Sequence, residues 1–451
     1  MPSLDRKRLE SLLITEEQKF HSEHQKSYEL YQRACRSMQG GVPMLWMVRW
    51  AGTFPVFVKE AKGAHFTDVD GRTYIDFCLG DTGAMTGHAP EATLAAIHTQ
   101  AAKGITLMLP TDDAIWVSEE LQHRFGLKYW QFTLTATDAN RFAIRMARHI
   151  TGRKYVLVYN HCYHGSVDES LATINANGEV EPRHGNLGPP VDPSETTKVI
   201  EFNDIPALEK ALASRDVALV LAEPAMTNIG IILPDPGYHD ALREITTKTG
   251  TLLLIDETHT FCAGPGGYTG RYNLKPDFLT CGKPLAGGIP AGVYGFTEKV
   301  ADRFWSMLKP DESDVGGIGG TLAGNALSLA AMRATLEHVL TPGMYERCGK
   351  LADRYERGVL DIIEENNLPW IVKRLGFRVE YWFRAAPPRN GGEAFAAIDP
   401  SLDRYMHLWA LNRGILMTPF HNMALIAADT TEADVDYHTH VFREAVQALF
   451  G

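Results

Sequence analysis

A lysine on a proline- and glycine-flanked turn is the residue of this chain best suited to covalent chemistry. Lys283 follows the apolar stretch Phe278–Cys281 and precedes a proline and a pair of glycines. Because proline and glycine disfavour helix and strand interiors, we expect the amine to lie on a turn at a strand end. Upstream, the apolar run Leu252–Ile255 leads directly into Asp256. A lysine amine can form a Schiff base, and a buried carboxylate can keep a ring nitrogen protonated.

This pair of residues is what pyridoxal phosphate chemistry requires, because the protonated ring can then accept electrons from a substrate. Each residue alone also has a simpler interpretation. A lysine beside glycines is usually a surface loop residue, and a carboxylate after an apolar run is often a helix N-cap. The hypothesis therefore depends on further parts of the same site elsewhere in the chain.

Two further candidates follow predicted strands in the first half of the chain. Ala136 and Thr137 lie among small and hydroxyl residues where a strand meets a helix pattern, so backbone N–H groups there could bind a phosphate. Tyr163, followed by His164, comes after the strand pattern Tyr155–Tyr159 and could stack on a cofactor ring. The alternatives are an ordinary helix N-cap and a packed core tyrosine.

Two more candidates lie further along the chain. Glu223 and Asn228 follow the strand pattern Val217–Ala222 and would face the same crevice, although a capped loop is the simpler interpretation. Thr321 lies in the glycine-rich segment 316–325, which precedes a helix pattern over about 324–340. Such a loop could admit a phosphate or act as a mobile flap, but on its own it is weak evidence.

Composition narrows the class of protein. The chain has 451 residues, of which 45% are hydrophobic and 22% charged, so a largely disordered chain is excluded. A formal net charge of −11 disfavours nucleic acid and anionic membranes as partners. The six cysteines show neither CxxC nor metal-ligand spacing, so we expect no metal and reduced thiols in a cytoplasmic enzyme. We expect no signal peptide and no membrane span, because no long apolar run exists.

The chain alternates short apolar strand patterns with helix patterns after about residue 90. This alternation predicts βαβ units and a mostly parallel sheet in an α/β fold, with ligands at the carboxyl ends of the strands. We predict an N-terminal segment (1–85) that contributes to a small domain, a large cofactor-binding domain (86–330) and a C-terminal small domain (331–451). The predicted strands are Trp130–Thr135, Tyr155–Tyr159, Val217–Ala222, Thr251–Ile255, Phe278–Cys281 and Ala291–Phe296.

The order of these pieces resembles the class III (omega-type) aminotransferases of PLP fold type I over about residues 40–450. The resemblance is strongest to members that are like glutamate-1-semialdehyde aminomutase and the β-amino-acid aminotransferases. It is carried by the segments Asp68–Phe77, Gly87-His88, Tyr163–Gly165, Glu223-Pro224, Asp256-Glu257, Gly282-Lys283, Gly320-Thr321 and Gly324-Asn325.

The resemblance implies a seven-stranded, mostly parallel sheet flanked by helices, with a smaller α+β domain built from both chain ends. It also implies a homodimer with shared active sites, in which Thr321 reaches the phosphate of the neighbouring subunit's cofactor. The implied roles are Schiff-base formation and proton transfer for Lys283, pairing with the pyridine N–H for Asp256, phosphate binding for Ala136 and Thr137, ring stacking for Tyr163, contact with the phenolic oxygen for Asn228, and cofactor contacts for His164 and Glu223.

Several positions depart from the family's pattern. Ala136 stands where the phosphate loop has a glycine, and the run Asp256–Ala263 lacks the family's glycine and basic residue, so we expect a remodelled loop. The stretch Met417–Leu425 lacks the arginine that grips a carboxylate in β-amino-acid relatives.

The substrate end of the site is therefore the open question. Phe420 suggests room for an apolar amine, and Arg49 could still bind a carboxylate from the N-terminal segment. Trp50, with Trp46, fits an aromatic-lined pocket, and His421 is a further candidate. Plain packing or surface roles are the simpler interpretation for all of them.

We therefore predict an aminotransferase. It would move an amino group from an amine or a β- or ω-amino acid to a keto or aldehyde acceptor by a ping-pong route through pyridoxamine phosphate. The alternative is an intramolecular aminomutase of the glutamate-1-semialdehyde type. A catalytically silent binding module is disfavoured by the intact lysine and aspartate, and a nicotinamide enzyme by the lack of an early G-x-G-x-x-G.

Overall fold

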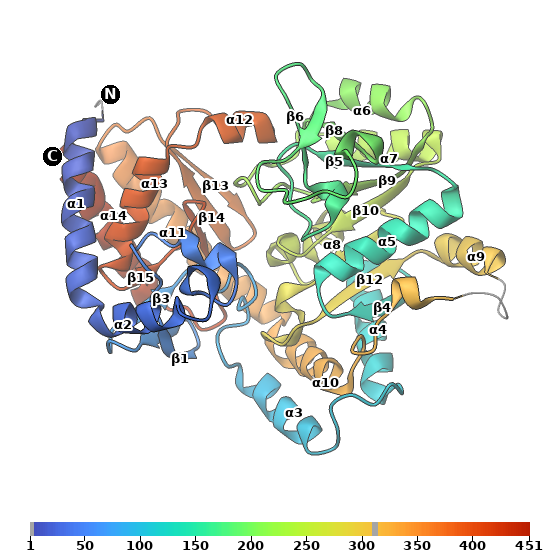
Figure 1. Cartoon of the computed structure of the whole chain (residues 1–451), viewed down its shortest axis with the longest axis horizontal. Coiled ribbons are helices and arrows are strands. Elements are labelled where there is room, and N and C mark those ends of the chain that lie inside the picture. The colour runs from blue at the N-terminus through green and yellow to red at the C-terminus, as the bar shows by residue number, and fades with distance from the viewer. Residues whose placement is uncertain (1–3, 309–313) are drawn as a thin grey trace. The chain divides into compact units, whose positions relative to one another are not determined.

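The computed structural model describes residues 4–308 and 314–451, which form two compact units (Figure 1). The large unit comprises Glu91–Tyr345 and Pro388–Ala396. The small unit comprises Met1–Pro90, Glu346–Pro387 and Ala397–Gly451, so it draws on both ends of the chain.

A seven-stranded sheet forms the centre of the large unit, in the order β4-β12-β11-β10-β9-β5-β8. Only β12 runs against its neighbours, so the predicted mostly parallel sheet is confirmed. The strands are β4 (Tyr129–Thr133), β5 (Tyr155–Tyr159), β8 (Thr197–Ile200), β9 (Val217–Ala222), β10 (Leu252–Asp256), β11 (Phe278–Cys281) and β12 (Gly292–Phe296).

The position of a strand in the sheet explains whether its sequence predicted it. Every residue of β9, β10 and β11 is buried, as expected of central parallel strands whose two faces are both covered. The edge strand β8 was not predicted. Its sequence, Thr-Lys-Val-Ile, is short and partly polar, which suits an edge but gives a weak strand signal.

Helices pack around this sheet. Helix α5 (Ala136–Thr151) lies across β4, β9, β10, β11 and β12, because its apolar positions share one face. Its N-cap is Thr135, and Gly152 ends it in the left-handed conformation. The other helices are α3 (Glu91–Ala101), α4 (Asp112–Phe125), α6 (Ile205–Leu212), α7 (Tyr238–Thr249), α8 (Gly267–Tyr272), α9 (Glu298–Met307), α10 (Ala326–Ala334) and α12 (Gly391–Ala396).

Two predictions about this unit were only partly right. The helix pattern over about 324–340 is α10 followed by a π-helical turn, η8 (Thr335–Val339). The segment 173–197, predicted as a surface excursion, includes a short hairpin of β6 (Ala172–Ile174) and β7 (Val180–Pro182).

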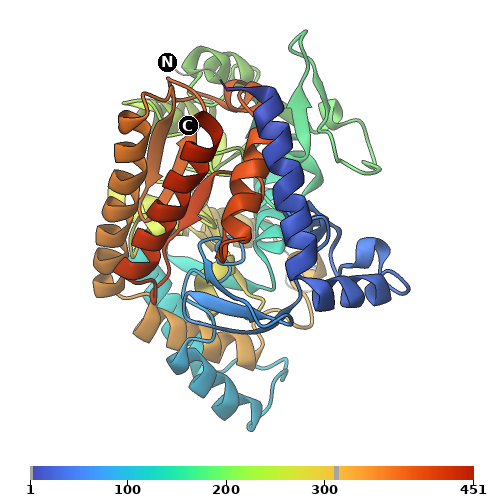
Figure 2. The same cartoon turned by 90° about the vertical axis from the view of Figure 1, so that its left-hand side faces the viewer.

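The small unit packs helices against two small sheets. In one sheet, β1 (Val58–Lys62), β2 (His65–Asp68), β3 (Thr73–Asp76) and β15 (Ile415–Leu416) are hydrogen-bonded in that order. The other has the order β13 (Ile371–Leu375), β14 (Arg378–Trp382), β16 (Met423–Leu425). Helix α13 (Pro400–Leu411) lies beside both terminal helices, α1 (Arg6–Glu23) and α14 (Glu432–Phe450) (Figure 2). The remaining helices are α2 (Gln25–Ala34) and α11 (Pro342–Glu365), which begins in the large unit.

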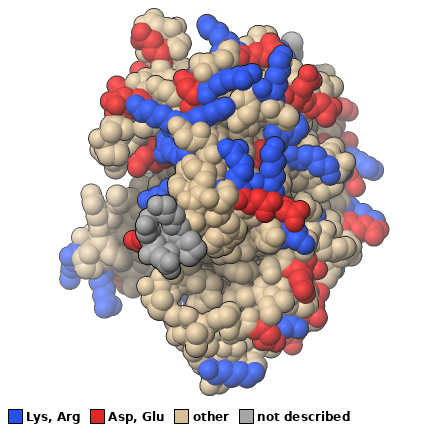
Figure 3. Space-filling view, turned by 90° about the vertical axis from the view of Figure 1, so that its right-hand side faces the viewer, with Lys and Arg blue, Asp and Glu red and all other residues tan. Residues whose placement is uncertain are grey.

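The surface carries charges of both signs. Lys and Arg side chains are interspersed with Asp and Glu side chains on the face in Figure 3. Among the described residues, no helix is long and apolar enough to cross a membrane.

Candidate active site

Asp256 and Lys283 lie at the same edge of the central sheet. Strands β10 and β11 are parallel, and Asp256 at the end of β10 is in register with Thr280. Lys283 follows β11 by two residues and starts the short 3-10 helix η6 (Lys283–Ala286). Its backbone φ is +44°, a left-handed conformation that is costly for a residue with a Cβ. The turn thus holds the lysine in a strained backbone conformation beside the strand that carries the aspartate.

Asp256 is buried and held by three donors from different segments. His164 Nδ1 lies 2.9 Å from Asp256 Oδ2, and Asn140 Nδ2 donates to the same oxygen at 2.9 Å. The backbone N–H of Thr258 donates to Oδ1 at 3.0 Å. Asn140 is itself fixed by Thr280 Oγ1, which donates to its Oδ1 at 2.6 Å. The carboxylate is therefore fixed in orientation by α5, by the loop after β5 and by its own loop.

These contacts keep the aspartate ionised. Burial alone would raise the pKa of Asp256, but its hydrogen bond to His164 and the charge of that ring lower the pKa to about 2. Burial alone would lower the pKa of His164, yet its interactions with Cys162 and Asp256 raise it to about 10. The buried pair therefore presents a negative carboxylate oxygen backed by a protonated imidazole over a wide range of pH.

The N-terminus of α5 forms a tight cradle with two glycines. Ala136 and Thr137 are its first residues, and the first turn of a helix leaves backbone N–H groups without acceptors inside the helix. A Cβ on Gly165, whose φ is +79°, would lie 2.0 Å from Thr137 Oγ1. A Cβ on Gly282 would lie 3.0 Å from the backbone N of Ala136. Both glycines therefore allow close backbone approach at a helix N-terminus suited to an anion.

Glu223 and Asn228 follow β9, the neighbour of β10. Glu223 is buried, and its Oε2 accepts hydrogen bonds from the backbone and hydroxyl of Thr227. Burial raises the pKa of Glu223 to about 7, against the opposing charge of His164. Asn228 is half-buried and donates from Nδ2 to the carbonyl of His161 at 3.2 Å. The carboxylate is therefore electrostatically linked to the His164–Asp256 pair.

Two other predicted cofactor contacts are more exposed. The Tyr163 side chain is 41% exposed, next to the buried His164. Thr321 is exposed in the turn that precedes α10. Both belong to the large unit, as do all the other predicted cofactor residues.

The predicted substrate residues belong to the small unit, where the structure brings them together. The rings of Trp46 and Phe420 meet edge to face with centroids 4.3 Å apart, and Trp50 lies 6.0 Å from Trp46. The Arg49 guanidinium lies 5.8 Å from the Phe420 ring centroid. His421 lies against Phe420, with ring centroids 5.9 Å apart. Segments distant in sequence thus form one aromatic cluster with an exposed arginine.

The loop after Asp256 is built around a buried carboxylate. Glu257 accepts from Thr260 Oγ1 at 2.5 Å and from the backbone N–H groups of Tyr268 and Thr269 at 3.0 and 2.5 Å. The segment Thr260–Ala263 forms the 3-10 helix η5. This fold of the loop brings His259 Nε2 within 2.7 Å of Lys283 Nζ.

Two residues of this site were not assigned a role from the sequence. Asn140 was seen only as part of a helix start, although a buried asparagine on an apolar helix face signals a required polar partner. His259 falls at a variable position of the family's pattern, so neither spacing nor resemblance indicated its contact with the lysine. Both contacts depend on how distant segments meet.

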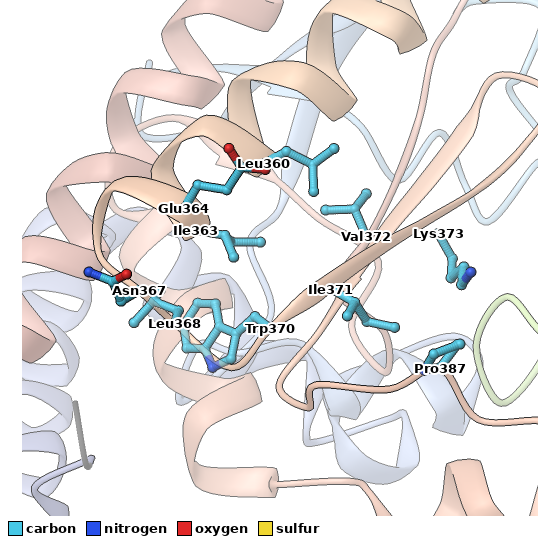
Figure 4. A pocket seen from close by; sticks show the side chains of 10 residues that line it. All are labelled: Leu360, Ile363, Glu364, Asn367, Leu368, Trp370, Ile371, Val372, Lys373 and Pro387. Carbon is cyan, nitrogen blue, oxygen red and sulfur yellow. The ribbon is translucent and has the colours of Figure 1, made fainter. Parts of the chain in front are cut away.

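A pocket of the small unit contains none of these residues (Figure 4). It has a volume of about 530 Å³ and lies between the end of α11 and strand β13. Its lining includes Leu360, Trp370 and Pro387.

Comparison with known proteins finds a matching family and similar proteins that cover most of the chain. The class-III aminotransferase family matches residues 46–433. A glutamate-1-semialdehyde 2,1-aminomutase of Desulfitobacterium hafniense (strain Y51) is 30% identical over 435 residues, which cover 94% of this chain and 99% of that protein. A glutamate-1-semialdehyde aminomutase structure from Pseudomonas aeruginosa PAO1 is 48% identical, with a TM-score of 0.96 and 99% of each chain covered. A variant of the latter was solved in complex with PMP.

A more distant structure shares the fold. The β-phenylalanine aminotransferase of Variovorax paradoxus is 24% identical, with a TM-score of 0.85 and 97% of each chain covered.

Proposed function

The chain belongs to the class-III aminotransferase family and is a pyridoxal-phosphate-dependent enzyme, and we propose that it moves an amino group within a single substrate, as a glutamate-1-semialdehyde aminomutase does. The family and fold type I predicted from the sequence are thereby confirmed. The observation that carries the proposal is the 48% identity to an aminomutase over 99% of both chains. The aminomutase, which was the alternative in the sequence-based prediction, is therefore better supported than the aminotransferase.

The residues of the large unit fit pyridoxal phosphate. Asp256 offers an ionised carboxylate to a protonated pyridine nitrogen, and the α5 N-terminus beside Gly165 offers N–H groups to a phosphate. When bound, the cofactor supplies an electron-accepting ring that stabilises negative charge on the substrate carbon.

We assign the following roles to the chain's own residues. Lys283 attaches the cofactor through Nζ and, once released, moves a proton between the two carbons that exchange substituents. Asp256 keeps the ring nitrogen protonated. Tyr163 covers the ring, and Asn228 and Glu223 contact its polar edge. His164 is the positioning residue for Asp256.

The name of the proposed substrate states which functional groups it carries. Glutamate-1-semialdehyde bears an aldehyde at C1, an amine at C2 and one carboxylate. A 2,1-aminomutase exchanges amine and carbonyl between these carbons, so no external acceptor, oxidant or reductant is consumed. Arg49 is the proposed carboxylate ligand, because it is an exposed arginine whose guanidinium lies 5.8 Å from the Phe420 ring centroid, beside the predicted substrate residues.

Intermolecular transamination is the second candidate. It is favoured by the aromatic cluster of Trp46, Trp50 and Phe420, which would suit a bulkier apolar amine. An enzyme of that kind needs a separate keto or aldehyde acceptor to complete its cycle.

We also propose that the enzyme is a homodimer. The segment before α4 exposes Leu107, Met108 and Leu109 at 46%, 76% and 72%. The backbone N–H of Leu327 donates to the carbonyl of Ile105 at 3.4 Å, which places this apolar segment beside the start of α10 and hence near Thr321. An exposed apolar patch of this kind is typical of a subunit interface, and a partner bound there would receive Thr321.

The two functions differ in a single-substrate reaction. We expect the purified, cofactor-loaded enzyme to convert glutamate-1-semialdehyde through many turnovers with no keto acid added. Conversion of one equivalent per site, resuming only when a keto acid is supplied, would instead support the aminotransferase. Lys283→Ala serves as the inactive control.

A further inference from the structure

His259 contacts the reactive amine directly. Its Nε2 lies 2.7 Å from Lys283 Nζ, within hydrogen-bond distance. The lysine backbone is left-handed, with φ at +44°, so the turn commits its side chain to a narrow set of directions. The contact joins the loop after β10 to the turn after β11, at the edge where the active site lies.

The position of His259 is set by a rigid loop. On one side of it, Asp256 is bound by three donors, and Glu257 is buried and accepts from Thr260 and from the start of α8. On the other side, η5 begins, and Cys262 Sγ donates to the His259 carbonyl at 3.2 Å. The backbone of His259 is therefore held in place by its own loop.

Two nitrogens at this distance share one proton. If the lysine is an ammonium ion, Nε2 accepts its proton; if the lysine is a neutral amine, Nε2–H donates to it. An amine attacks a carbonyl, or removes a proton from carbon, only in its neutral form. Histidine is the side chain whose ordinary pKa lies closest to neutral, so an imidazole at this distance can take up or return the lysine's proton.

Resting on the proposed function, we propose that His259 is a positioning residue for Lys283, which directs its Nζ and exchanges a proton with it. The assignment adds a residue that the family's pattern leaves variable. It also gives a role to the loop after Asp256, in which the 3-10 helix η5 begins directly after His259.

Other titratable groups face the same edge. Asp256 ends β10 and Glu257 follows it, Glu223 follows β9, His164 and Cys162 follow β5, Cys281 ends β11 and Cys262 lies in η5. Asp256 and His164 are bonded to each other, and Glu257 is bound by Thr260, Tyr268 and Thr269. A pH measurement must therefore compare variants that leave these groups unchanged.

The experiment measures cofactor uptake as well as activity. Cofactor-free wild type, His259→Gln and His259→Ala are mixed with pyridoxal phosphate, and the growth of visible absorbance is followed from pH 6 to 9. His338→Gln, at an exposed histidine of η8, is the matched histidine control. Circular dichroism checks that each variant folds, and His259→Gln keeps a hydrogen-bonding side chain if His259→Ala does not fold.

We expect uptake at pH 7 to slow by on the order of tenfold or more in both His259 variants, with the midpoint of the pH–rate curve moved upward. The value of kcat should fall with KM little changed, and added imidazole should restore part of the rate in His259→Ala. If the His259 variants keep the wild-type uptake rate and pH midpoint while Lys283→Ala still loses the absorbance, the role of His259 is wrong but the proposed function stands. Failure of the wild type to take up the cofactor would instead overturn the proposed function.

Discussion

His164 Nδ1 and Asp256 Oδ2 are 2.9 Å apart in the interior of the large unit. The carboxylate helps to raise the pKa of the imidazole, and the imidazole lowers the pKa of the carboxylate, so both groups stay charged. The pair links the loop after β5 to the end of β10. It fixes the orientation of the carboxylate that we propose pairs with the cofactor's ring nitrogen. Because Asn140 and Thr258 also donate to this carboxylate, the site is preorganised by several segments together.

Breaking this pair should destabilise the cofactor-free enzyme. His164→Leu leaves a buried carboxylate with fewer partners, which we expect to cost about 3 kcal/mol in the free energy of unfolding. Urea denaturation measures this cost. In a double-mutant cycle, Asp256→Leu combined with His164→Leu should cost clearly less than the sum of the two changes. Additive costs would show that the two groups do not stabilise each other.

The stability difference between wild type and His164→Leu should depend on pH. The raised pKa of His164 gives a stabilisation that is complete below its unfolded value near 6.5 and is lost as pH rises through about 10. The lowered pKa of Asp256 gives a stabilisation that is complete above its unfolded value near 3.8 and is lost as pH falls through about 2. Denaturation at several pH values should therefore show the largest difference between about pH 4 and 6.5. A difference that grew from pH 7 to pH 10 would contradict this account.

Gly165 should tolerate no side chain. Gly165→Ala places a Cβ against Thr137 at the α5 N-terminus, whereas Gly178→Ala has the same left-handed backbone, with φ of +78°, and nothing within 4 Å. Both variants incur a backbone cost of about 1 kcal/mol, but only Gly165→Ala should also displace the helix start. We expect pyridoxal phosphate affinity, measured by absorbance titration, to fall at least about tenfold in Gly165→Ala. Equal affinities in the two variants would argue against a phosphate at this cradle.

Lys283 should account for the enzyme's visible absorbance. Lys283→Ala removes the amine that we propose attaches the cofactor, so the bound cofactor's absorbance band should disappear while the protein stays folded. Lys275→Ala is the control, because Lys275 is an exposed lysine just before β11 whose Nζ donates to Asn273 Oδ1. Retention of the band in Lys283→Ala would show that a residue other than Lys283 attaches the cofactor.

Arg49 should govern selectivity for carboxylate-bearing substrates. Arg49→Ala removes the proposed ligand, and we expect kcat/KM for glutamate-1-semialdehyde to fall about 100-fold, as when a charge-assisted pair worth some 3 kcal/mol is lost. Arg36→Ala, at another exposed arginine of the small unit, is the control. If Arg49→Ala leaves the activity unchanged and simple aryl-alkyl amines react well, the aromatic cluster is instead an apolar amine pocket.

The exposed apolar segment before α4 should control assembly. Met108→Glu introduces a charge into the proposed interface, so sedimentation should show a shift from dimer toward monomer at micromolar concentration. Leu187→Glu is the control, because Leu187 is 88% exposed in the 173–197 excursion. A wild type that sediments as a monomer, or a Met108→Glu variant that remains fully dimeric, would exclude this interface.

The strongest elements of the fold could be predicted from the sequence. Buried strands such as β9 are continuous apolar runs, and amphipathic helices such as α7 repeat their apolar residues with helical period, so both signals are local. The edge strand β8 and the hairpin of β6 and β7 were missed. Such strands are short and depend on pairing partners elsewhere in the chain, which leaves little trace in their own residues.

For the site, the sequence by itself determined which chemistry is available. It supplied an aspartate at the end of one strand and a lysine after the next, in a chain whose alternation of strand and helix patterns predicts parallel strands. Only the tertiary structure decided how these groups are held. The contacts of Asn140 and His164 with Asp256, and of His259 with Lys283, join residues far apart along the chain. Hydrogen bonds of this kind depend on ångström-scale positions set by packing of the whole sheet and its helices, and no local pattern of residues encodes them.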